Sequence, residues 1–276
     1  LDKSAPKLKS HKFVGAYSYG IQLRVDEPPF DKKAVRQAMA MATDGEAFAT
    51  MQDVGKLPKY FYPIWLGHPT SLRYTWEELP EAIQQLYEYH PDKAKQMLAE
   101  AGYADGFKVD GYSTTAADDV DRASLLKDMW AKVGVDVNII AKDPVTLDGF
   151  IRSRPLKFHG ALVRAADHGN PAEVLLKAET THHWNVNAYS NPWWDEQMAE
   201  LKKTVDIPKR HAMIKKLSLF LAEETLDIKT DPRMEAVYWW PWLKNYYGEF
   251  AVADNDFQPL LAKAWLDMKL KKEMGY

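Results

Sequence analysis

The chain has 276 residues, of which 46% are hydrophobic and 27% charged, and its formal net charge is −3. These values are typical of folded globular proteins and exclude a disordered chain. Because both signs of charge are scattered along the sequence, it offers no basic field for nucleic acid or for an anionic membrane. Cysteine is absent, which excludes disulfides, thiol catalysis and cysteine-ligated metal. No apolar run is long enough to span a bilayer.

The first residues predict one strand and two short helices that meet at a corner. Residues 13–25 alternate imperfectly and contain two glycines, yet they favour a strand that Glu27-Pro-Pro29 terminates. Asp31 is placed to cap a helix with one apolar face. The spacing Thr43-Asp-Gly-Glu46 matches a capping box, so we expect a second helix that ends near Gly55.

A long segment rich in proline and aromatic residues follows, at residues 56–80. Such a composition is incompatible with regular secondary structure. We expect a surface loop whose rings pin it to the body of the protein; the alternative is an aromatic wall that faces a ligand. Apolar positions between Leu79 and Tyr87 then indicate a further short helix.

The best-marked helix lies between His90 and Gly106. Pro91 suits its first position, where the missing N–H costs nothing. Ala94, Met97, Leu98 and Ala101 form one apolar face. Gly102 can adopt the left-handed conformation that closes a helix.

Strands and helices alternate in the next segment. We expect strands over residues 107–113, 135–140 and 158–163, with helices over 117–133 and 144–153 between them. This order predicts an α/β protein with a mainly parallel sheet that is flanked by helices. Two further helices are expected after Asn191 and Asp206, followed by a tail dense in aromatic rings.

One acidic residue falls at the edge of this sheet where ligands usually bind. In open α/β sheets, ligands bind outside the carboxyl ends of the strands. The third strand runs into Arg164-Ala-Ala-Asp-His-Gly-Asn-Pro171, so Asp167 lies at that edge and can hold an ammonium group or sugar hydroxyls. The alternative is that Asp167 caps the helix near Pro171 or stays solvated.

Other chemistry finds no support in the residues. The spacing of the histidines, among them the adjacent pair His182-His183, matches no metal-ligand pattern, so we expect no metal. Phosphate-binding loops and nucleophile motifs are absent from the sequence. No carboxylate pair has local support for catalysis, so we expect no enzyme and no cofactor.

Several segments together resemble one protein family. The first is Pro28-Pro-Phe-Asp-Lys-Lys-Ala-Val-Arg-Gln-Ala-Met-Ala-Met-Ala-Thr-Asp44, and the second is Asp92-Lys-Ala-Lys-Gln-Met-Leu-Ala-Glu-Ala-Gly-Tyr-Ala-Asp-Gly-Phe107. The others are Trp130-Ala-Lys-Val-Gly-Val-Asp-Val137, Asn187-Ala-Tyr-Ser-Asn-Pro192 and Ala264-Trp-Leu-Asp267. They are similar, in order, to the motifs of the family 5 extracellular solute-binding proteins, the oligopeptide- and dipeptide-binding proteins of ABC importers.

The resemblance implies a fold and a division of the chain. The fold is the C-terminal lobe of a two-lobe periplasmic-binding-protein fold (type II, cluster C), with strands of an incomplete N-terminal lobe. Residues 1–27 would be a strand and hinge of the N-terminal lobe, 28–232 the ligand-binding lobe, and 233–276 a return segment to the N-terminal lobe. We therefore expect a mature form or fragment that lacks about half of the family's usual length, with the aromatic tail packed against the missing lobe.

The resemblance also implies a function. The protein would be an exported, periplasmic or cell-surface component of an ABC importer, with or without a lipid anchor, that binds peptides in an interlobe cleft and partners a membrane permease. An oligosaccharide or a metal complex is the alternative ligand, and a glycan hydrolase is the alternative from another class.

The resemblance points to ligand-binding residues in the run from Arg164 to Asn170. In peptide-binding members, the carboxylate matching Asp167 holds the α-ammonium group of the ligand. The neighbouring candidates are Arg164, His168 and Asn170. Arg164 stands where the family has tryptophan, and a cation there either neutralises the carboxylate or selects an anionic ligand.

Overall fold

A computed structural model describes residues 5–51, 63–64, 68–167, 171–249 and 262–276. The chain divides into two compact units. The larger unit is Ala16–Pro232, and the smaller unit combines Leu1–Gly15 with Arg233–Tyr276. Strands β1 (Lys9–Leu23) and β5 (Asp227–Trp239) each belong to both units.

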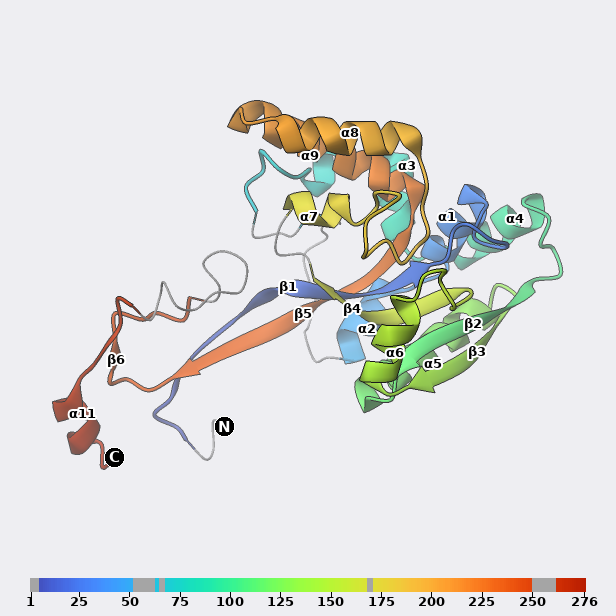
Figure 1. Cartoon of the computed structure of the whole chain (residues 1–276). Coiled ribbons are helices and arrows are strands. Elements are labelled where there is room, and N and C mark those ends of the chain that lie inside the picture. Colours follow the sequence, from blue (N-terminus) through green and yellow to red (C-terminus); the bar gives the residue numbers. More distant parts are fainter. Residues whose placement is uncertain (1–4, 52–62, 65–67, 168–170, 250–261) are drawn as a thin grey trace. The chain divides into compact units, whose positions relative to one another are not determined.

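The sheet has five strands in the order β3-β2-β4-β1-β5 (Figure 1). Strand β2 (Phe107–Thr114) is parallel to both β3 (Val135–Lys142) and β4 (Ala161–Asp167). The predicted parallel core is therefore confirmed.

Strands β1 and β5 make the sheet a mixed one. Strand β1 is antiparallel to β4, with Tyr17 opposite Asp167 and Leu23 opposite Ala161. Strand β5 runs from the larger unit to the smaller one, opposite in direction to β1. Sequence reasoning missed β5, because Pro232 and the aromatic run that follows it obscure any strand pattern.

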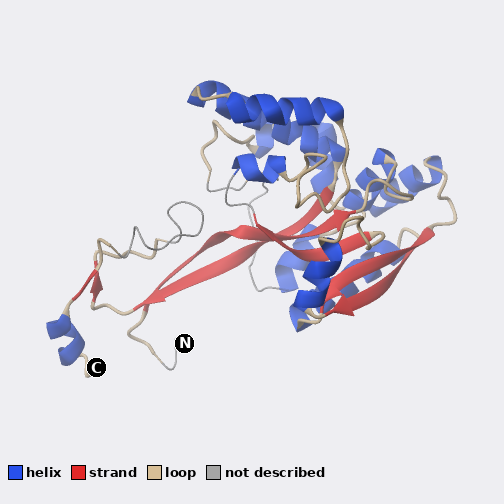
Figure 2. Cartoon of the chain, viewed as in Figure 1, coloured by secondary structure: helices blue, strands red, loops and turns tan. Residues whose placement is uncertain are grey.

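Figure 2 shows the helices that accompany the sheet. They are α1 (Lys33–Met41), α2 (Gly45–Met51), α3 (Glu81–Gln84), α4 (Pro91–Glu100), α5 (Ala117–Ala131), α6 (Pro144–Ile151), α7 (Pro171–Leu176), α8 (Pro192–Lys203), α9 (Ile207–Glu224) and α11 (Met268–Glu273). The short strands β6 (Leu243–Lys244) and β7 (Trp265–Leu266) pair in the smaller unit.

Both faces of the sheet are covered within the larger unit. Val109 of β2 joins a core cluster with α1, α4 and α5, whereas Tyr112 of the same strand joins a second cluster with Leu147 and Ile151 of α6. Alternate residues of a strand point to opposite faces, so β2 is buried from both sides. A third cluster is formed mainly by α7, α8 and α9.

The helix expected between His90 and Gly106 is confirmed as α4. Ala94 and Leu98 are buried, and Gly102 has a φ of 95°. The amide of Tyr103 donates to the carbonyl of Leu98 at 2.8 Å, which closes the helix in a Schellman motif. The chain then turns into β2.

The expected helix starts differ in their capping residues. Lys32, not Asp31, precedes α1, and its side chain makes no capping bond. Asp44, not Thr43, caps α2, since its Oδ1 accepts from the amides of Glu46 and Ala47. Thr43 instead donates to the carbonyl of Met39 at 2.8 Å.

One further expected helix differs in detail from the structure, and two other expected features lie partly outside the described residues. The helix expected over residues 79–87 is broken into α3 and a 3₁₀ turn, Gln85–Tyr87. The expected end of the second helix near Gly55 lies outside the described residues, as do residues 56–62 and 65–67 of the loop expected at 56–80. The described part of that loop contains one 3₁₀ turn, Trp76–Glu78.

A buried arginine fastens α1 to the end of α9. Arg36 is 4% exposed. Its guanidinium donates to the carbonyls of Phe30 (2.9 Å) and Glu224 (2.8 Å), and to the Glu224 carboxylate at 3.2 Å. Burial is the main cause that lowers the pKa of Arg36, and the charge of Glu224 opposes this effect.

A buried asparagine joins the inner ends of the two strands that span both units. The side-chain amide of Asn187 donates to the carbonyls of Leu23 (3.0 Å) and Leu226 (2.8 Å) and to Asp227 Oδ1 (3.0 Å). The amide of Leu23 also donates to the carbonyl of Leu226 at 3.0 Å. These bonds fix the end of β1 against the start of β5.

The Arg36 contact leads to the first prediction. Arg36→Met should lower the free energy of unfolding by about 3 kcal/mol, because the partly buried Glu224 carboxylate and two carbonyls lose their donor. Lys33→Met is the matched control: Lys33 also pairs with Glu224, but it is solvent-exposed, so the loss should be below about 1 kcal/mol. Urea unfolding measures both, and equal losses would contradict the assignment.

A pair of glycines leads to the second prediction. Gly106 has a φ of 74°, and a Cβ on it would lie 1.8 Å from the carbonyl oxygen of Gly134. Gly106→Ala should therefore destabilise the protein by about 2 kcal/mol or more. Gly149, in α6, has open space around its Cβ position, so Gly149→Ala should stabilise by up to about 1 kcal/mol. Thermal unfolding tests both predictions: Gly106→Ala should lower the melting temperature, and Gly149→Ala should raise it.

Candidate functional site

The three parallel strands all end at the carboxyl edge of the sheet, where β4 runs three residues beyond the level of Thr114. Thr114 of β2 is paired with Lys142 of β3, and β4 ends at Asp167. We call this the carboxyl edge and define it by these three residues. Topology makes it the edge at which open α/β sheets bind ligands.

Helix starts border the carboxyl edge. The hydroxyl of Thr114 donates to Asp119 Oδ2 at 2.5 Å and accepts from the amide of Ala116 at 3.1 Å, which fixes the turn into α5. Asp143 caps α6 by accepting from the amide of Thr146 at 3.0 Å. Hydrogen bonds from Thr146 lower the pKa of Asp143 below its ordinary value, so this carboxylate is ionised at neutral pH.

A buried cation lies under β1 close to this edge. Arg122 of α5 is 2% exposed, and its guanidinium carbon is 3.6 Å from the centroid of the Tyr19 ring and 6.0 Å from that of Phe48. Both distances are within the range of cation–π attraction. Tyr19 is paired with Ala165 of β4, two residues before Asp167. Sequence reasoning missed Arg122, because nothing in a helical pattern distinguishes a buried arginine from a solvated one.

The structure describes the backbone of only two of the four predicted site residues. Arg164 lies opposite Gly20, and Asp167 lies opposite Tyr17 at the end of β4. Asp167 is at the carboxyl edge, as expected, but it is the last residue of β4 and not a residue beyond the strand, because the strand expected over 158–163 lies at Ala161–Asp167. The side chains of Arg164 and Asp167, and all of His168 and Asn170, lie outside the described residues, so their role in binding remains a prediction.

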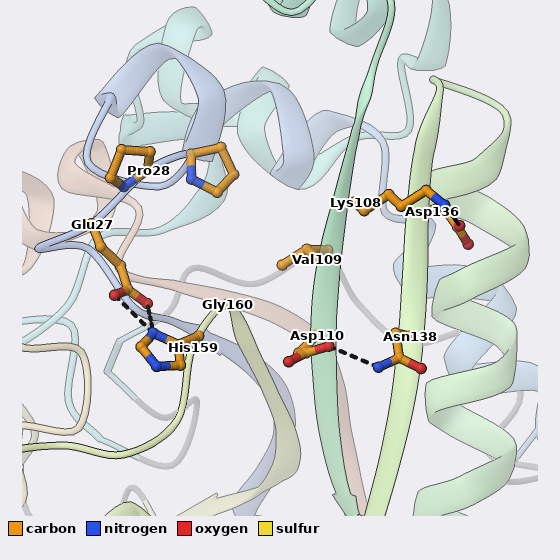
Figure 3. A pocket seen from close by; sticks show the side chains of 10 residues that line it. Glu27, Pro28, Lys108, Val109, Asp110, Asp136, Asn138, His159 and Gly160 are labelled. Carbon is orange, nitrogen blue, oxygen red and sulfur yellow. Dashed lines mark hydrogen bonds and ion pairs between the residues drawn. The ribbon is translucent and has the colours of Figure 1, made fainter.

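An open cavity of about 720 Å³ lies at the opposite, amino edge of the sheet (Figure 3). On one wall the Glu27 carboxylate pairs with Nδ1 of His159 at 2.8 Å. On the other wall the amide of Asn138 donates to Asp110 Oδ1 at 2.8 Å. The remaining lining residues include Pro28, Pro29, Lys108 and Asp136. Sequence reasoning did not anticipate this cavity, because its walls come from four separate segments between Glu27 and Gly160.

The described residues contain neither a metal-binding cluster nor a membrane-spanning helix. Within the described ranges, no group of three or more histidine, aspartate or glutamate side chains is arranged to hold a metal ion. Among the helices of the described part of the chain, none is both long and apolar enough to cross a membrane.

Comparison with known proteins identifies the family. Residues 1–197 match the model of the middle region of the bacterial extracellular solute-binding proteins, family 5. The match covers more than half of the chain, and it includes α4 and the whole parallel sheet. The chain belongs to this family of bacterial extracellular solute-binding proteins.

Individual relatives agree with this membership. Heme-binding protein A of Haemophilus influenzae is 30% identical over 213 residues, which cover 72% of this chain and 36% of that protein. Di/tripeptide-binding protein 1 of Pseudomonas aeruginosa is 27% identical over 238 residues, covering 80% and 41%. The periplasmic binding protein DppA of Helicobacter pylori, solved with the peptide STSA, has a TM-score of 0.74 at 20% identity and covers 96% and 50%.

The comparisons establish the fold and also the extent of the match. The architecture is that of the periplasmic binding proteins, with a mixed sheet flanked by helices. The chain spans half or less of the length of each of the three relatives named above.

Proposed function

We propose that the full-length protein is the extracytoplasmic substrate-binding component of an ABC importer and that it binds peptides at the carboxyl edge. The observation that carries the proposal is the end of β4 at Asp167, at the carboxyl edge of the parallel strands, in a chain that belongs to the solute-binding family. Its activity is binding, without catalysis, and its partner is the membrane permease of the importer.

Charge supports a peptide as the ligand. A carboxylate at this edge offers two acceptor oxygens to the α-ammonium group of a peptide, and charge-assisted hydrogen bonds are roughly twice as strong as neutral ones. Relatives of this chain include proteins named for binding dipeptides and tripeptides.

The two strands that span both units support closure by a hinge. We infer that residues 1–27 and 233–276 belong to the N-terminal lobe of the full-length protein and that 28–232 form the ligand-binding lobe. β1 and β5 each belong to both compact units; one boundary between the units falls between Pro232 and Arg233, and the other falls between Gly15 and Ala16, twelve residues before the inferred lobe boundary. Two crossing strands allow one lobe to rotate against the other by small changes in a few backbone angles.

The stacked rings of the smaller unit favour one alternative ligand. Trp240 and Trp242 stack with centroids 4.6 Å apart and planes 7° apart, and Tyr276 contacts both rings. Trp242 is buried, whereas Trp240 is partly exposed and Tyr276 is exposed. Exposed flat rings can hold sugars, so an oligosaccharide is the second candidate. A thermal-shift screen of the full-length protein against peptides and oligosaccharides separates the two ligand classes.

The third prediction concerns Asp167 in the full-length protein. Asp167→Asn should weaken binding of trialanine tenfold or more, because one charge-assisted anchor is lost, at a cost of about 1.5–3 kcal/mol. The variant should also lose the preference for trialanine over its N-acetylated form. Isothermal titration calorimetry measures both effects.

A matched control tests the choice of sheet edge. Asp110→Asn removes the same charge from the cavity at the amino edge and should leave the affinity for trialanine within twofold. The assignment is wrong if Asp110→Asn weakens binding while Asp167→Asn does not. If the unaltered protein binds oligosaccharides but no peptide, the peptide assignment fails.

A further inference from the structure

A second cavity, of about 470 Å³, lies where three loops of the larger unit converge. The loops are the one after β1, the one between α6 and β4, and the one between α7 and α8. The cavity is lined by Arg24, Asp26, Arg154, Pro155, Leu156, Thr180, Thr181, His182, Asn185, Ala188, Tyr189 and Ser190. Its size is typical of pockets for small molecules.

Side chain to backbone hydrogen bonds hold the first two loops together. Arg24 is 8% exposed and forms a bidentate pair with Asp26. Its Nη1 also donates to the carbonyl of Phe158 at 2.7 Å, which ties the loop after β1 to the loop before β4. The guanidinium of Arg154 donates to the carbonyl of His183 at 2.9 Å and so reaches the third loop.

The third loop is closed by a buried asparagine. Asn185 is 4% exposed, and its amide nitrogen donates to the carbonyls of Glu179 (3.0 Å) and Tyr189 (2.8 Å). Its amide oxygen accepts from the backbone N–H of Tyr189 at 3.1 Å. The wall of the cavity is therefore fixed before any ligand binds, which reduces the entropy cost of binding.

The cavity carries an excess positive charge. Asp26 is the lining carboxylate, and Arg24 already neutralises it. Within the described part of the chain, Arg154 has no carboxylate partner and donates to the carbonyl oxygens of Ser153 and His183. The nearby Arg152, by contrast, pairs with Asp148 at 2.7 Å. Among the described residues, no carboxylate compensates the charge of the exposed Arg154, which lines the cavity.

Neutral donors surround this charge. The hydroxyls of Thr180, Thr181 and Ser190 are solvent-exposed around the cavity, and those of Thr180 and Ser190 are 3.4 Å apart. Burial, together with the neighbouring His183, lowers the pKa of His182, so its imidazole is neutral at pH 7. A guanidinium fork with several O–H donors is a combination that matches the oxygens of a carboxylate or a phosphate.

We propose that this cavity is a second binding site, for a small oxyanion of the carboxylate or phosphate type, with Arg154 as its principal ligand-binding residue. The site is separate from the carboxyl edge. Arg24 donates its backbone N–H to the carbonyl of Gly160, immediately before β4, whereas Asp167 ends that strand. Seven strand residues span about 20 Å, which exceeds the length of an extended tripeptide, about 10 Å, and separates Asp167 from the end of the cavity at Arg24.

The test uses the full-length protein with two probes, sodium phosphate and sodium acetate, titrated at constant ionic strength set with sodium chloride. Binding is followed through the imidazole NMR signals of His182, assigned by comparison with His182→Gln. Saturable shifts are expected for at least one probe, and the stronger of the two tells phosphate from carboxylate. Arg154→Met should weaken that binding tenfold or more, and Arg154→Lys should recover part of the loss.

Lys157→Met is the matched control, because it removes an exposed cation three residues away that does not line the cavity. It should change the affinity less than twofold. Equal losses in Arg154→Met and Lys157→Met, or shifts that rise with probe concentration without saturating, would overturn the proposal. Asp167→Asn should leave the oxyanion affinity unchanged, so a failure at one site is distinguishable from a failure at the other.

Discussion

The antiparallel pairing of β1 with β4 is the constraint on which the rest of the larger unit depends. Strand β1 belongs to both units and enters the sheet beside Asp167, at the edge where the parallel strands end. The same pairing carries β1 to Leu23, where Asn187 fastens it to the start of β5. The register of β1 against β4 therefore fixes the position of the carboxyl edge relative to β1 and β5, the two strands that leave the larger unit. A slip of one residue would move every β1 side chain to the opposite face and expose Ile21 and Leu23.

Local signals in the sequence predicted much of this fold. Period-3.6 and period-2 patterns located α4, α5 and the three parallel strands, since each is amphipathic or buried over enough residues. The position of Asp167 followed from topology alone. Helix caps were predicted less well. Asp44, and not Thr43, caps α2, because the Thr43 hydroxyl donates to the carbonyl of Met39 and accepts from the indole N–H of Trp130.

Other features depend on contacts between residues far apart in the sequence, and no local pattern reveals them. Strand β5 is defined by its place beside β1, not by alternation of its own residues. Arg36, Arg122 and Arg24 are buried by partners up to 188 residues away, whereas an isolated arginine in a sequence is normally solvated. Both cavities are likewise assembled from segments that are separated in the chain. The sequence therefore predicts the strand end that carries Asp167, but not the residues that line the cavities.

The central claim is that ligand binds at the carboxyl edge and not at the amino edge. Hydrogen–deuterium exchange of the full-length protein, with and without the ligand that native mass spectrometry finds bound to it, tests this claim most directly. Binding should slow amide exchange in peptides that cover the ends of β2 and β4, at residues 113–116 and 164–167. Protection confined to residues 27–30, 108–110 and 159–160, which border the cavity at the amino edge, would contradict the account.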